Sequence, residues 1–360
     1  MRSGLRLCVC VAVLATLGTC TGRRDAAVAD ATPPAPTAPT APQRPLRIAM
    51  IAKSATNPSF VAARLGAETR ARELSAQLRR GIDIEWLTPP QESGKVQAER
   101  IAQAIKDGVD AVLLSCSDAL ELTPAIDDAV AHGVPVMTFD SDAPDSKRFA
   151  YIGVDDFKAG ETLMAELARL TGRGARVAVL AGNRTAPNLR RRVEGVLHEV
   201  AARHPDIKIV GTYFHVETPE EASATVMRAQ AAHPEISGWA MVGGWALYTR
   251  TLLRELTDTA GARGRRPAIK MVAFNALPPQ LAYVEAGLAP VLLAQPTYLW
   301  GARGVETIVD KLLARRPVPA HVPAELVRVT ADNLVAWAHQ LRDWGFADVP
   351  EEYLRPTLAK

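Results

Sequence analysis

Cysteine is scarce in this sequence. Four cysteines occur in 360 residues, and three of them, Cys8, Cys10 and Cys20, fall within the first 20. The fourth, Cys116, has no second cysteine to pair with in the remaining chain, so we predict no internal disulfide there. Metal-ligand spacings such as Cys-x-x-Cys are also absent, and the sequence predicts neither a metal site nor a cofactor.

An excess of charge of one sign is missing as well. Lysine and arginine number 42 against 39 aspartates and glutamates, and no long basic run occurs. Because nucleic-acid binding depends on clustered positive charge, we expect no nucleic-acid partner. The sequence also lacks the G-x-S-x-G, Walker, G-x-G-x-x-G and H-E-x-x-H motifs, and we expect a protein that is not an enzyme.

The beginning of the chain carries a short apolar stretch. Arg2 and Arg6 precede a twelve-residue apolar stretch from Leu7 to Gly18. A basic start and a short apolar stretch are typical of a secretory signal, and this stretch is too short to span a bilayer with those flanks. We therefore expect residues 1–20 to be a signal peptide and the protein to reach the periplasm or cell envelope.

The residues that follow favour a protein tethered to a membrane by lipid alone. Leu17-Gly18-Thr19-Cys20 resembles the bacterial lipobox, in which the cysteine is lipidated, so Cys20 is the candidate anchor. Ordinary cleavage after Ala29 is the alternative. Residues 21–45 are rich in Pro, Ala and Thr, with six prolines between Ala31 and Pro45. Such a composition is extended and semi-rigid, and it predicts a linker.

From Leu46 onward, short apolar runs alternate with stretches of helical periodicity. Nearly continuous apolar runs are typical of strands buried on both faces of a parallel sheet. The alternation predicts βαβ units, and about eleven strands fit two lobes better than one open sheet. The predicted strands are Leu46–Ala52, Ile82–Leu87, Ala111–Ser115, Val134–Phe139, Tyr151–Val154, Val177–Leu180, Ile207–His215, Trp239–Val242, Ile269–Phe274, Pro290–Ala294 and Leu326–Val329. The predicted helices are Pro58–Gln77, Val96–Asp107, Leu120–His132, Phe157–Thr171, Asn188–Arg203, Pro219–His233, Trp245–Glu255 and Trp300–Leu313.

The loops after these strands are the place to look for a binding site. In doubly wound sheets, ligands bind at the carboxyl ends of the strands. Here those loops are rich in Asn, Asp, Arg and Gln, with a few aromatic residues. Such polar side chains donate and accept hydrogen bonds, and an aromatic face supplies a flat apolar platform. This combination is the chemistry that binds a polyhydroxylated small molecule.

The motifs in these loops resemble a known family. Asn57-Pro58-Ser59-Phe60, after the first strand, is similar to the opening of the periplasmic ribose-type sugar-binding proteins, the receptors of ABC sugar importers. Further similar motifs follow in the same order, so the resemblance covers roughly residues 46–330. These motifs are Pro135–Asp140, Tyr151–Gly160, Arg190–Gly195, Val272–Asn275 and Ala294–Glu306.

The resemblance implies a fold and a function. The fold is α/β, with two Rossmann-like lobes of parallel sheets joined by a three-crossing hinge, the type I periplasmic-binding-protein fold. The N-terminal lobe would comprise residues 46–153 and 297–325, and the C-terminal lobe residues 154–296 and 326–360. We expect a monomer that captures a small sugar or polyol between its lobes and delivers it to the membrane permease of an ABC transporter. A sugar sensor feeding a chemoreceptor or membrane kinase is the alternative.

The resemblance also implies which residues contact the ligand. Ser59, Ser141 and Asn275 differ from the ribose receptor, which implies a neutral monosaccharide or polyol other than ribose. Ser141, Asp155 and Asp156 are expected at the hinge or in the cleft. The ligand-binding residues are expected to be Asn57, Phe60, Asp140, Arg190, Trp245, Asn275 and Gln295.

Simpler interpretations exist for some of these residues. Asn57 could serve only as a helix cap, followed by a proline at the first helical position. Phe60 and Trp245 could be core residues. An Asp140–Asp155 pair that acts on a sugar is the enzymatic alternative.

Overall fold

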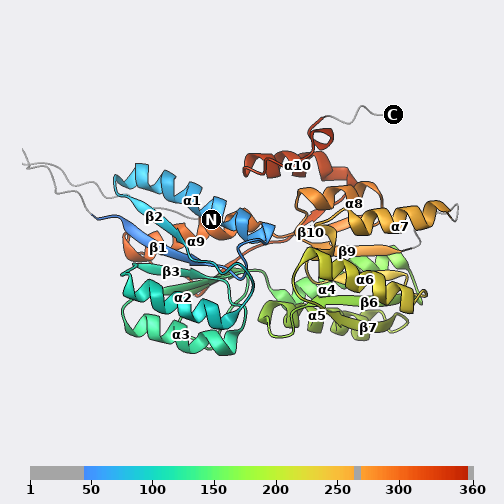
Figure 1. Ribbon diagram of the computed structural model, residues 1–360, viewed down its shortest axis with the longest axis horizontal. Helices are drawn as coiled ribbons and strands as arrows, with labels where there is room; N and C mark the ends of the chain where they lie inside the picture. Colours follow the sequence, from blue (N-terminus) through green and yellow to red (C-terminus); the bar gives the residue numbers. More distant parts are fainter. Residues whose placement is uncertain (1–43, 263–268, 356–360) are drawn as a thin grey trace, which may run out of the picture. The chain divides into compact units, whose positions relative to one another are not determined.

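A computed structural model describes residues 44–262 and 269–355. The predicted signal peptide, Cys20 and the predicted linker up to residue 43 lie outside these residues. Two six-stranded sheets organise the described chain, each with helices on both faces (Figure 1). The predicted α/β class with two Rossmann-like lobes is confirmed. Within the described ranges, none of the helices has the length and apolar character needed to span a bilayer.

The first sheet is entirely parallel and has the strand order β11-β5-β4-β3-β1-β2. Helices α1 and α9 pack together on one face, and α2 and α3 pack together on the other. These elements form the first lobe. Their bounds are β1 (Leu46–Ile51), α1 (Pro58–Leu78), β2 (Ile82–Trp86), α2 (Gly94–Lys106), β3 (Ala111–Leu114), α3 (Ala119–Ala131), β4 (Val136–Phe139), β5 (Ala150–Gly153), α9 (Thr297–Leu312) and β11 (His321–Pro323).

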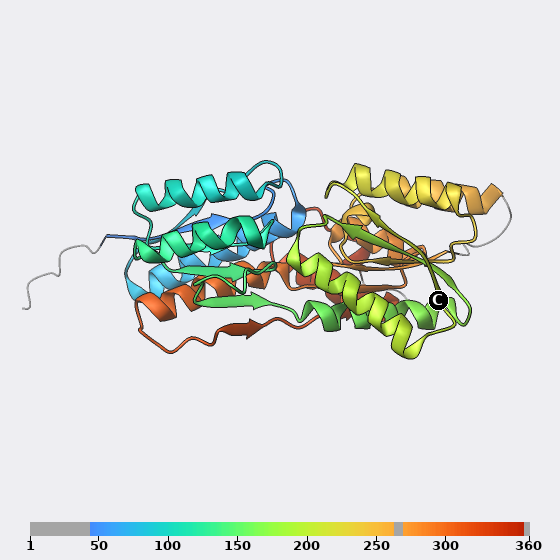
Figure 2. The same cartoon turned by 90° about the horizontal axis from the view of Figure 1, so that it is seen from below.

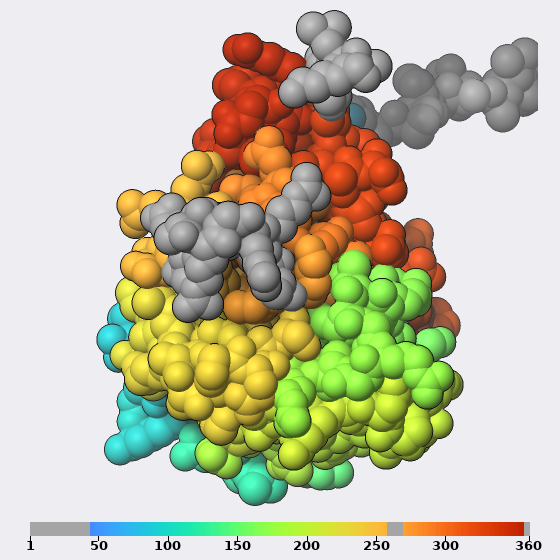
Figure 3. Space-filling model, turned by 90° about the vertical axis from the view of Figure 1, so that its right-hand side faces the viewer, coloured from blue at the N-terminus to red at the C-terminus, as the bar shows by residue number. Residues whose placement is uncertain are grey.

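The second sheet repeats this plan with the order β12-β10-β9-β8-β6-β7. Helices α4 and α5 lie on one side, and α6 and α7 on the other (Figure 2). Figure 3 looks onto the end formed by these elements. They form the second lobe, bounded by α4 (Asp156–Thr171), β6 (Arg176–Gly182), α5 (Pro187–Arg203), β7 (Lys208–Phe214), α6 (Pro219–Ala232), β8 (Gly238–Met241), α7 (Thr251–Ala262), β9 (Lys270–Phe274), α8 (Leu281–Glu285), β10 (Val291–Ala294), β12 (Val327–Val329) and α10 (Leu334–Asp343).

Within the described ranges, the chain passes between the sheets three times. These passages connect β5 to α4, β10 to α9, and β11 to β12. The last passage explains why β12 is antiparallel to β10, although the prediction was for parallel sheets. Strand β11 points toward the second sheet, and only residues 324–326 separate it from β12, so the chain continues in the same direction. No crossover helix reverses it.

Glycine pairs hold two equivalent helix pairs close together. A Cβ atom at Gly66 of α1 would lie 2.0 Å from the Tyr298 carbonyl oxygen of α9. In the second lobe, a Cβ atom at Gly160 of α4 would lie 2.1 Å from the Arg192 carbonyl oxygen of α5. The helices can approach this closely only because these positions have no side chain. The contact also fixes α5 next to the strand ends.

The sequence missed several short elements. Strand β11, which has three residues and includes a proline, was not predicted, and neither were α8 and α10. The helix predicted over Trp245–Glu255 is a 3-10 turn at Trp245–Leu247 followed by α7. At the interruption, the Tyr283 hydroxyl donates to the Thr249 carbonyl oxygen and accepts from the Leu253 amide. This side chain satisfies backbone groups that a continuous helix would have paired.

Candidate functional site

Residues at the carboxyl ends of both sheets line a small cavity, which we call the inner cavity. Its volume of about 30 Å³ is close to the share of one molecule in liquid water. Side chains therefore fill most of the space beside the residues that follow β4, β9 and β10. Six of the seven predicted ligand-binding residues line it: Asn57, Phe60, Asp140, Trp245, Asn275 and Gln295.

Asp140 organises one side of the inner cavity. It follows β4 with a left-handed backbone (φ 58°), a conformation that Asp and Asn tolerate better than most residues. Its carboxylate accepts hydrogen bonds from the Ser115 hydroxyl (3.0 Å) and from the side-chain amide nitrogen of Asn188 (3.2 Å), and it lies 3.9 Å from the Lys53 ammonium. Lys53 donates in turn to the side-chain carbonyl oxygen of Asn188 (3.2 Å). Because Asn188 belongs to α5, this polar network joins the two lobes.

Asn275 holds the equivalent position in the second sheet, directly after β9, and also has a left-handed backbone (φ 92°). Its amide nitrogen donates to Ser59 (3.1 Å) and to the Tyr248 hydroxyl. Its carbonyl oxygen accepts from the Gln295 amide (2.8 Å). Burial raises the pKa of Tyr248 to about 12, so its hydroxyl keeps its proton at physiological pH. Ser59 lies in α1, which makes this a second polar link between the lobes.

The structure does not bring Arg190 to this group. Arg190 is exposed on α5, whereas Arg192 is 2% exposed and lines the inner cavity. Arg192 donates to Asp156 (2.8 Å), to the Val242 carbonyl oxygen (3.1 Å) and to Gln295 (2.9 Å). Residues two apart on a helix point about 200° apart, so only one of these two arginines can face the cavity. Arg192 therefore occupies the position at the cavity that was expected for Arg190.

Three predicted residues have two structural roles each. Asn57 caps α1, since its side chain accepts from the Ser59 amide (3.0 Å), and it also lines the cavity. Phe60 packs edge-on against Phe139, with ring centroids 6.2 Å apart, and forms part of the wall. Trp245 is buried in the core of the second lobe and also lines the cavity. The simpler interpretations and the predicted positions are therefore compatible.

The residues expected at the hinge differ in their surroundings. Ser141 is fully buried, and its hydroxyl has no hydrogen-bond partner among the described residues. Asp155 is exposed between β5 and α4, where its carboxylate caps α4 by accepting from the Lys158 amide (3.1 Å). Asp156 is paired with Arg192. Burial raises the pKa of Asp156 to about 7, although the charge of Arg192 lowers it.

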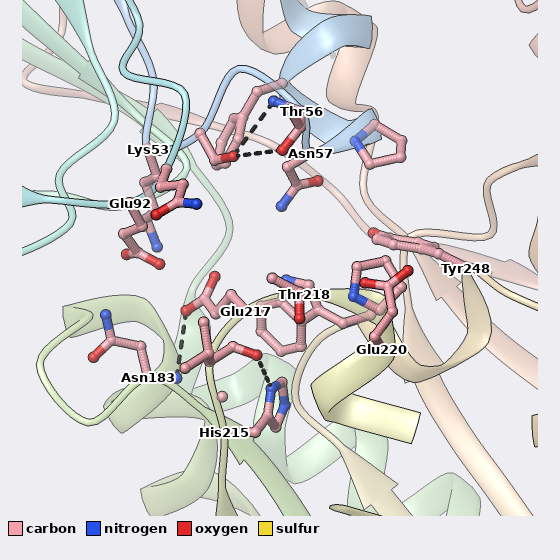
Figure 4. Close-up of a pocket in the computed structure, with 18 of the residues that line it drawn as sticks. Lys53, Thr56, Asn57, Glu92, Asn183, His215, Glu217, Thr218, Glu220 and Tyr248 are labelled. Carbon is pink, nitrogen blue, oxygen red and sulfur yellow. Dashed lines mark hydrogen bonds between the residues drawn. The ribbon is translucent and has the colours of Figure 1, made fainter. Parts of the chain in front are cut away.

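A larger cavity of about 890 Å³, which we call the outer cavity, adjoins the inner one (Figure 4). The two share Lys53, Asn57, Phe60, Glu217 and Trp245 in their walls. Its volume lies within the range of about 300–1,000 Å³ that is usual for small-molecule sites. The remaining wall comes mainly from the loops after β1, β2, β6 and β7.

Charged side chains meet where the two cavities join. Lys53 is only 2% exposed. Burial lowers the pKa of Lys53, but the carboxylates of Glu217, Asp140 and Glu92 together raise it above its ordinary value. Burial, followed by the charge of Glu92, raises the pKa of Glu217 to about 8. In Figure 4, the carboxylates of Glu92 and Glu217 face each other beside Lys53.

Part of this site was not predicted from the sequence. Asn188 and Arg192 are four positions apart on α5, and Leu189 and Val196, seven positions apart, mark the buried stripe of that helix. That spacing would have favoured Arg192 over Arg190. Glu92 and Glu217 lie in the loops after β2 and β7, whose strands are only half-buried, and no sequence pattern distinguished them.

The chain belongs to the periplasmic binding protein domain family, whose model matches residues 48–315. The resemblance to ribose-type receptors and the type I fold expected from the sequence are thereby confirmed. The ribose import binding protein of Bacillus subtilis is 34% identical over 145 residues, which are 40% of this chain and 45% of that protein. The match thus spans less than half of that relative.

Other relatives match over more of their length. The D-ribose/D-allose-binding protein of Pseudomonas aeruginosa is 24% identical over 278 residues, 75% of this chain and 83% of that protein. Among solved structures, an ABC transporter solute-binding protein of Burkholderia graminis in complex with D-arabinose has a TM-score of 0.73 and 25% identity, covering 80% of this chain and 96% of that one. The Caulobacter myo-inositol-binding protein has the same fold, with a TM-score of 0.71, 22% identity, and coverage of 83% and 97%.

Proposed function

We propose that this protein is an extracytoplasmic solute-binding protein that captures a small sugar or polyol between its lobes and delivers it to an ABC importer by hinge closure. The observation that carries the proposal is the polar network at the two sets of strand ends. Asp140 and Asn188 on one side, and Asn275 and Gln295 on the other, present donors and acceptors within one small cavity. Ring hydroxyls require both kinds of group.

The relatives support this ligand class. The names of the related proteins include ribose and allose, and the similar solved structures include proteins that bind D-arabinose and myo-inositol. Each of these ligands is a small polyhydroxylated molecule. A site of buried polar groups discriminates against analogues that lack one hydroxyl, because an unpaired buried group costs about 1–3 kcal/mol. We therefore propose a binding protein and not an enzyme.

The proposed mechanism is closure around the three chain passages. We keep the lobe boundaries expected from the sequence, 46–153 with 297–325 and 154–296 with 326–360. Direct bonds such as Lys53 to Asn188 (3.2 Å) and Asn275 to Ser59 (3.1 Å) join the lobes across the inner cavity. A ligand hydroxyl that replaces such a bond bridges the same two lobes. For binding to drive closure, the ligand must bind the closed form more tightly than the open form.

A thermal-shift screen tests the ligand class. The screen compares pentoses, hexoses, polyols, amino acids and nucleosides at equal concentration. We expect stabilisation by one or a few members of the sugar and polyol groups. Stabilisation by a nucleoside or an amino acid alone would contradict the proposal. Small-angle scattering with the stabilising ligand should then show compaction, and an unchanged profile at saturation would contradict hinge closure.

The proposed location is the periplasm or cell envelope, with the protein held as a monomer by lipid on Cys20. Replacement of Cys20 by Ser should move the protein from the membrane fraction to the soluble fraction. A wild-type protein that is already soluble would exclude lipidation without excluding export.

A further inference from the structure

We propose that the ligand carries a protonated amino group, as an amino sugar or an aminated cyclitol does, and that this group binds between the carboxylates of Glu92 and Glu217. The inference rests on the proposed function, because it adds a charged substituent to a sugar or polyol. It replaces the neutral ligand expected from the sequence.

The charges at the junction of the two cavities do not balance. Arg192 is paired with Asp156 (2.8 Å), and Lys53 lies 3.9 Å from Asp140. Glu92 and Glu217 have no such cationic partner among the described residues. Among the ion pairs within 4.0 Å that residues 44–262 and 269–355 form, none includes either glutamate. When both glutamates are ionised, this group of six residues has four carboxylates and two cations, so a ligand that brings positive charge would stabilise the ionised forms and release the proton that Glu217 holds at pH 7.

The same two carboxylates lack hydrogen-bond donors. Oε1 of Glu92 is buried and has no partner among the described residues. Glu217 accepts one long hydrogen bond, from the backbone amide of Asn183 at 3.4 Å. An ionised carboxylate is acceptor-only, so a ligand must supply donors to satisfy it. An ammonium group supplies three donors together with a positive charge, whereas a hydroxyl supplies one donor and none of the charge.

Two other occupants of this place fit less well. The charge of Lys53 acts on Glu217 and Glu92 as well as on Asp140, but among the described residues its ammonium donates a hydrogen bond to Asn188 and to neither glutamate. A metal ion is disfavoured, since the described part of the chain contains no group of three or more His, Cys, Asp or Glu side chains arranged to hold one. A ligand-borne ammonium needs only the two facing carboxylates that Figure 4 shows.

The shape of the cavities sets where such a ligand would lie. Lys53, Asn57, Phe60, Glu217 and Trp245 line both cavities, so a ring held in the outer cavity can reach polar groups of the inner one. The outer volume of about 890 Å³ accepts such a ring without rearrangement of the wall. Glu217 lies at the junction, where an amino substituent would meet it.

The test uses sets of sugars that differ only in one substituent. Glucosamine, galactosamine and mannosamine are compared with the parent hexoses and with the N-acetylated forms, which keep the substituent but lose its charge. Affinity is measured by titration calorimetry at pH 7 for the wild type, Glu92→Gln, Glu217→Gln and, as a control, Glu221→Gln. Glu221 is exposed in the first turn of α6 and lines neither cavity.

We expect at least one amino sugar to bind tenfold or more tightly than its parent and its N-acetylated form. Glu92→Gln and Glu217→Gln should each lower the ratio of amino-sugar affinity to parent-hexose affinity at least tenfold, whereas Glu221→Gln should leave that ratio unchanged. Neutral sugars that bind as tightly as every amino sugar would overturn this inference and leave the proposed function standing. Failure of every sugar and polyol, in this titration and in the thermal-shift screen, would overturn the proposed function itself.

Discussion

Replacement of Arg192 by Met should destabilise the protein strongly, whereas the same replacement at Arg190 should not. Arg192 is 2% exposed and donates to Asp156, Gln295 and the Val242 carbonyl oxygen. Methionine retains most of the side-chain volume but none of the donors, so it leaves a buried carboxylate without its cation. Breaking a buried ion pair in this way costs about 3–5 kcal/mol.

The pKa of Asp156 sets how this cost depends on pH. Burial raises that pKa to about 7 even beside Arg192, and loss of the arginine should raise it further. At pH 5 the carboxyl of the variant is protonated, which relieves the unpaired charge. At pH 8 more of the charge persists, and we expect the lower end of the range, about 3 kcal/mol. For a domain of this size, that corresponds to a fall in Tm of roughly 6–12 °C.

Urea unfolding followed by circular dichroism measures this difference at pH 8 and pH 5. Arg190→Met is the matched control, because it removes the same side chain from the same helix at an exposed position and should stay within about 0.5 kcal/mol of the wild type. Equal stability of the two variants, or a larger loss at Arg190, would refute the assignment of Arg192 to the buried site.

Other expected outcomes test further parts of the site. Glu217 has a pKa raised to about 8, so in the folded protein it holds a proton that the unfolded chain releases above about pH 4.5, and its contribution to stability falls as pH rises through about 8. Glu217→Gln should therefore flatten the Tm–pH curve over that range, with Glu92, Lys53 and Asp140 facing the group in both proteins; an unchanged curve would contradict the shift. Tyr248→Phe removes a hydroxyl shared by Ser59 and Asn275 and should cost about 0.5–1.5 kcal/mol in urea unfolding, and full stability would argue against that network. Cys116 is fully buried and its thiol pKa is raised, so maleimide labelling followed by peptide mapping should modify it only after unfolding, and rapid labelling of the native protein would disprove its burial.

The sequence predicted the site best where a residue directly follows a strand. Asp140, Asn275 and Gln295 come immediately after apolar runs, and the end of a parallel strand places its next residue at the sheet edge without further information. Arg192 was missed because its direction depends on the rotation of α5, which the contact between Gly160 and the Arg192 backbone fixes. Glu92 was missed because its loop position is set by tertiary packing alone.

The strands, too, were predicted best where the local sequence alone determines the structure. Strands buried on both faces were predicted within a few residues, because their apolar runs leave little alternative. Strand β11 consists of His321–Pro323 and is only partly buried, so hydrophobicity does not mark it. Its position depends on pairing with β5, a contact between residues about 170 positions apart.

The left-handed backbone at Asp140 and Asn275 limits how this protein, in its proposed function, can acquire a new specificity. Most residues with a Cβ pay roughly 1–2 kcal/mol in that conformation, and Asp, Asn and Gly are the ones that adopt it readily. A single mutation at either position can therefore interchange the carboxylate of Asp, the amide of Asn and the absent side chain of Gly. A longer or branched polar side chain would destabilise the protein even without ligand. Ser59 and Asn188 lie in helices α1 and α5 and carry no such restriction. Evolution or redesign toward another ligand should thus change the helical residues first and keep the two strand-end residues.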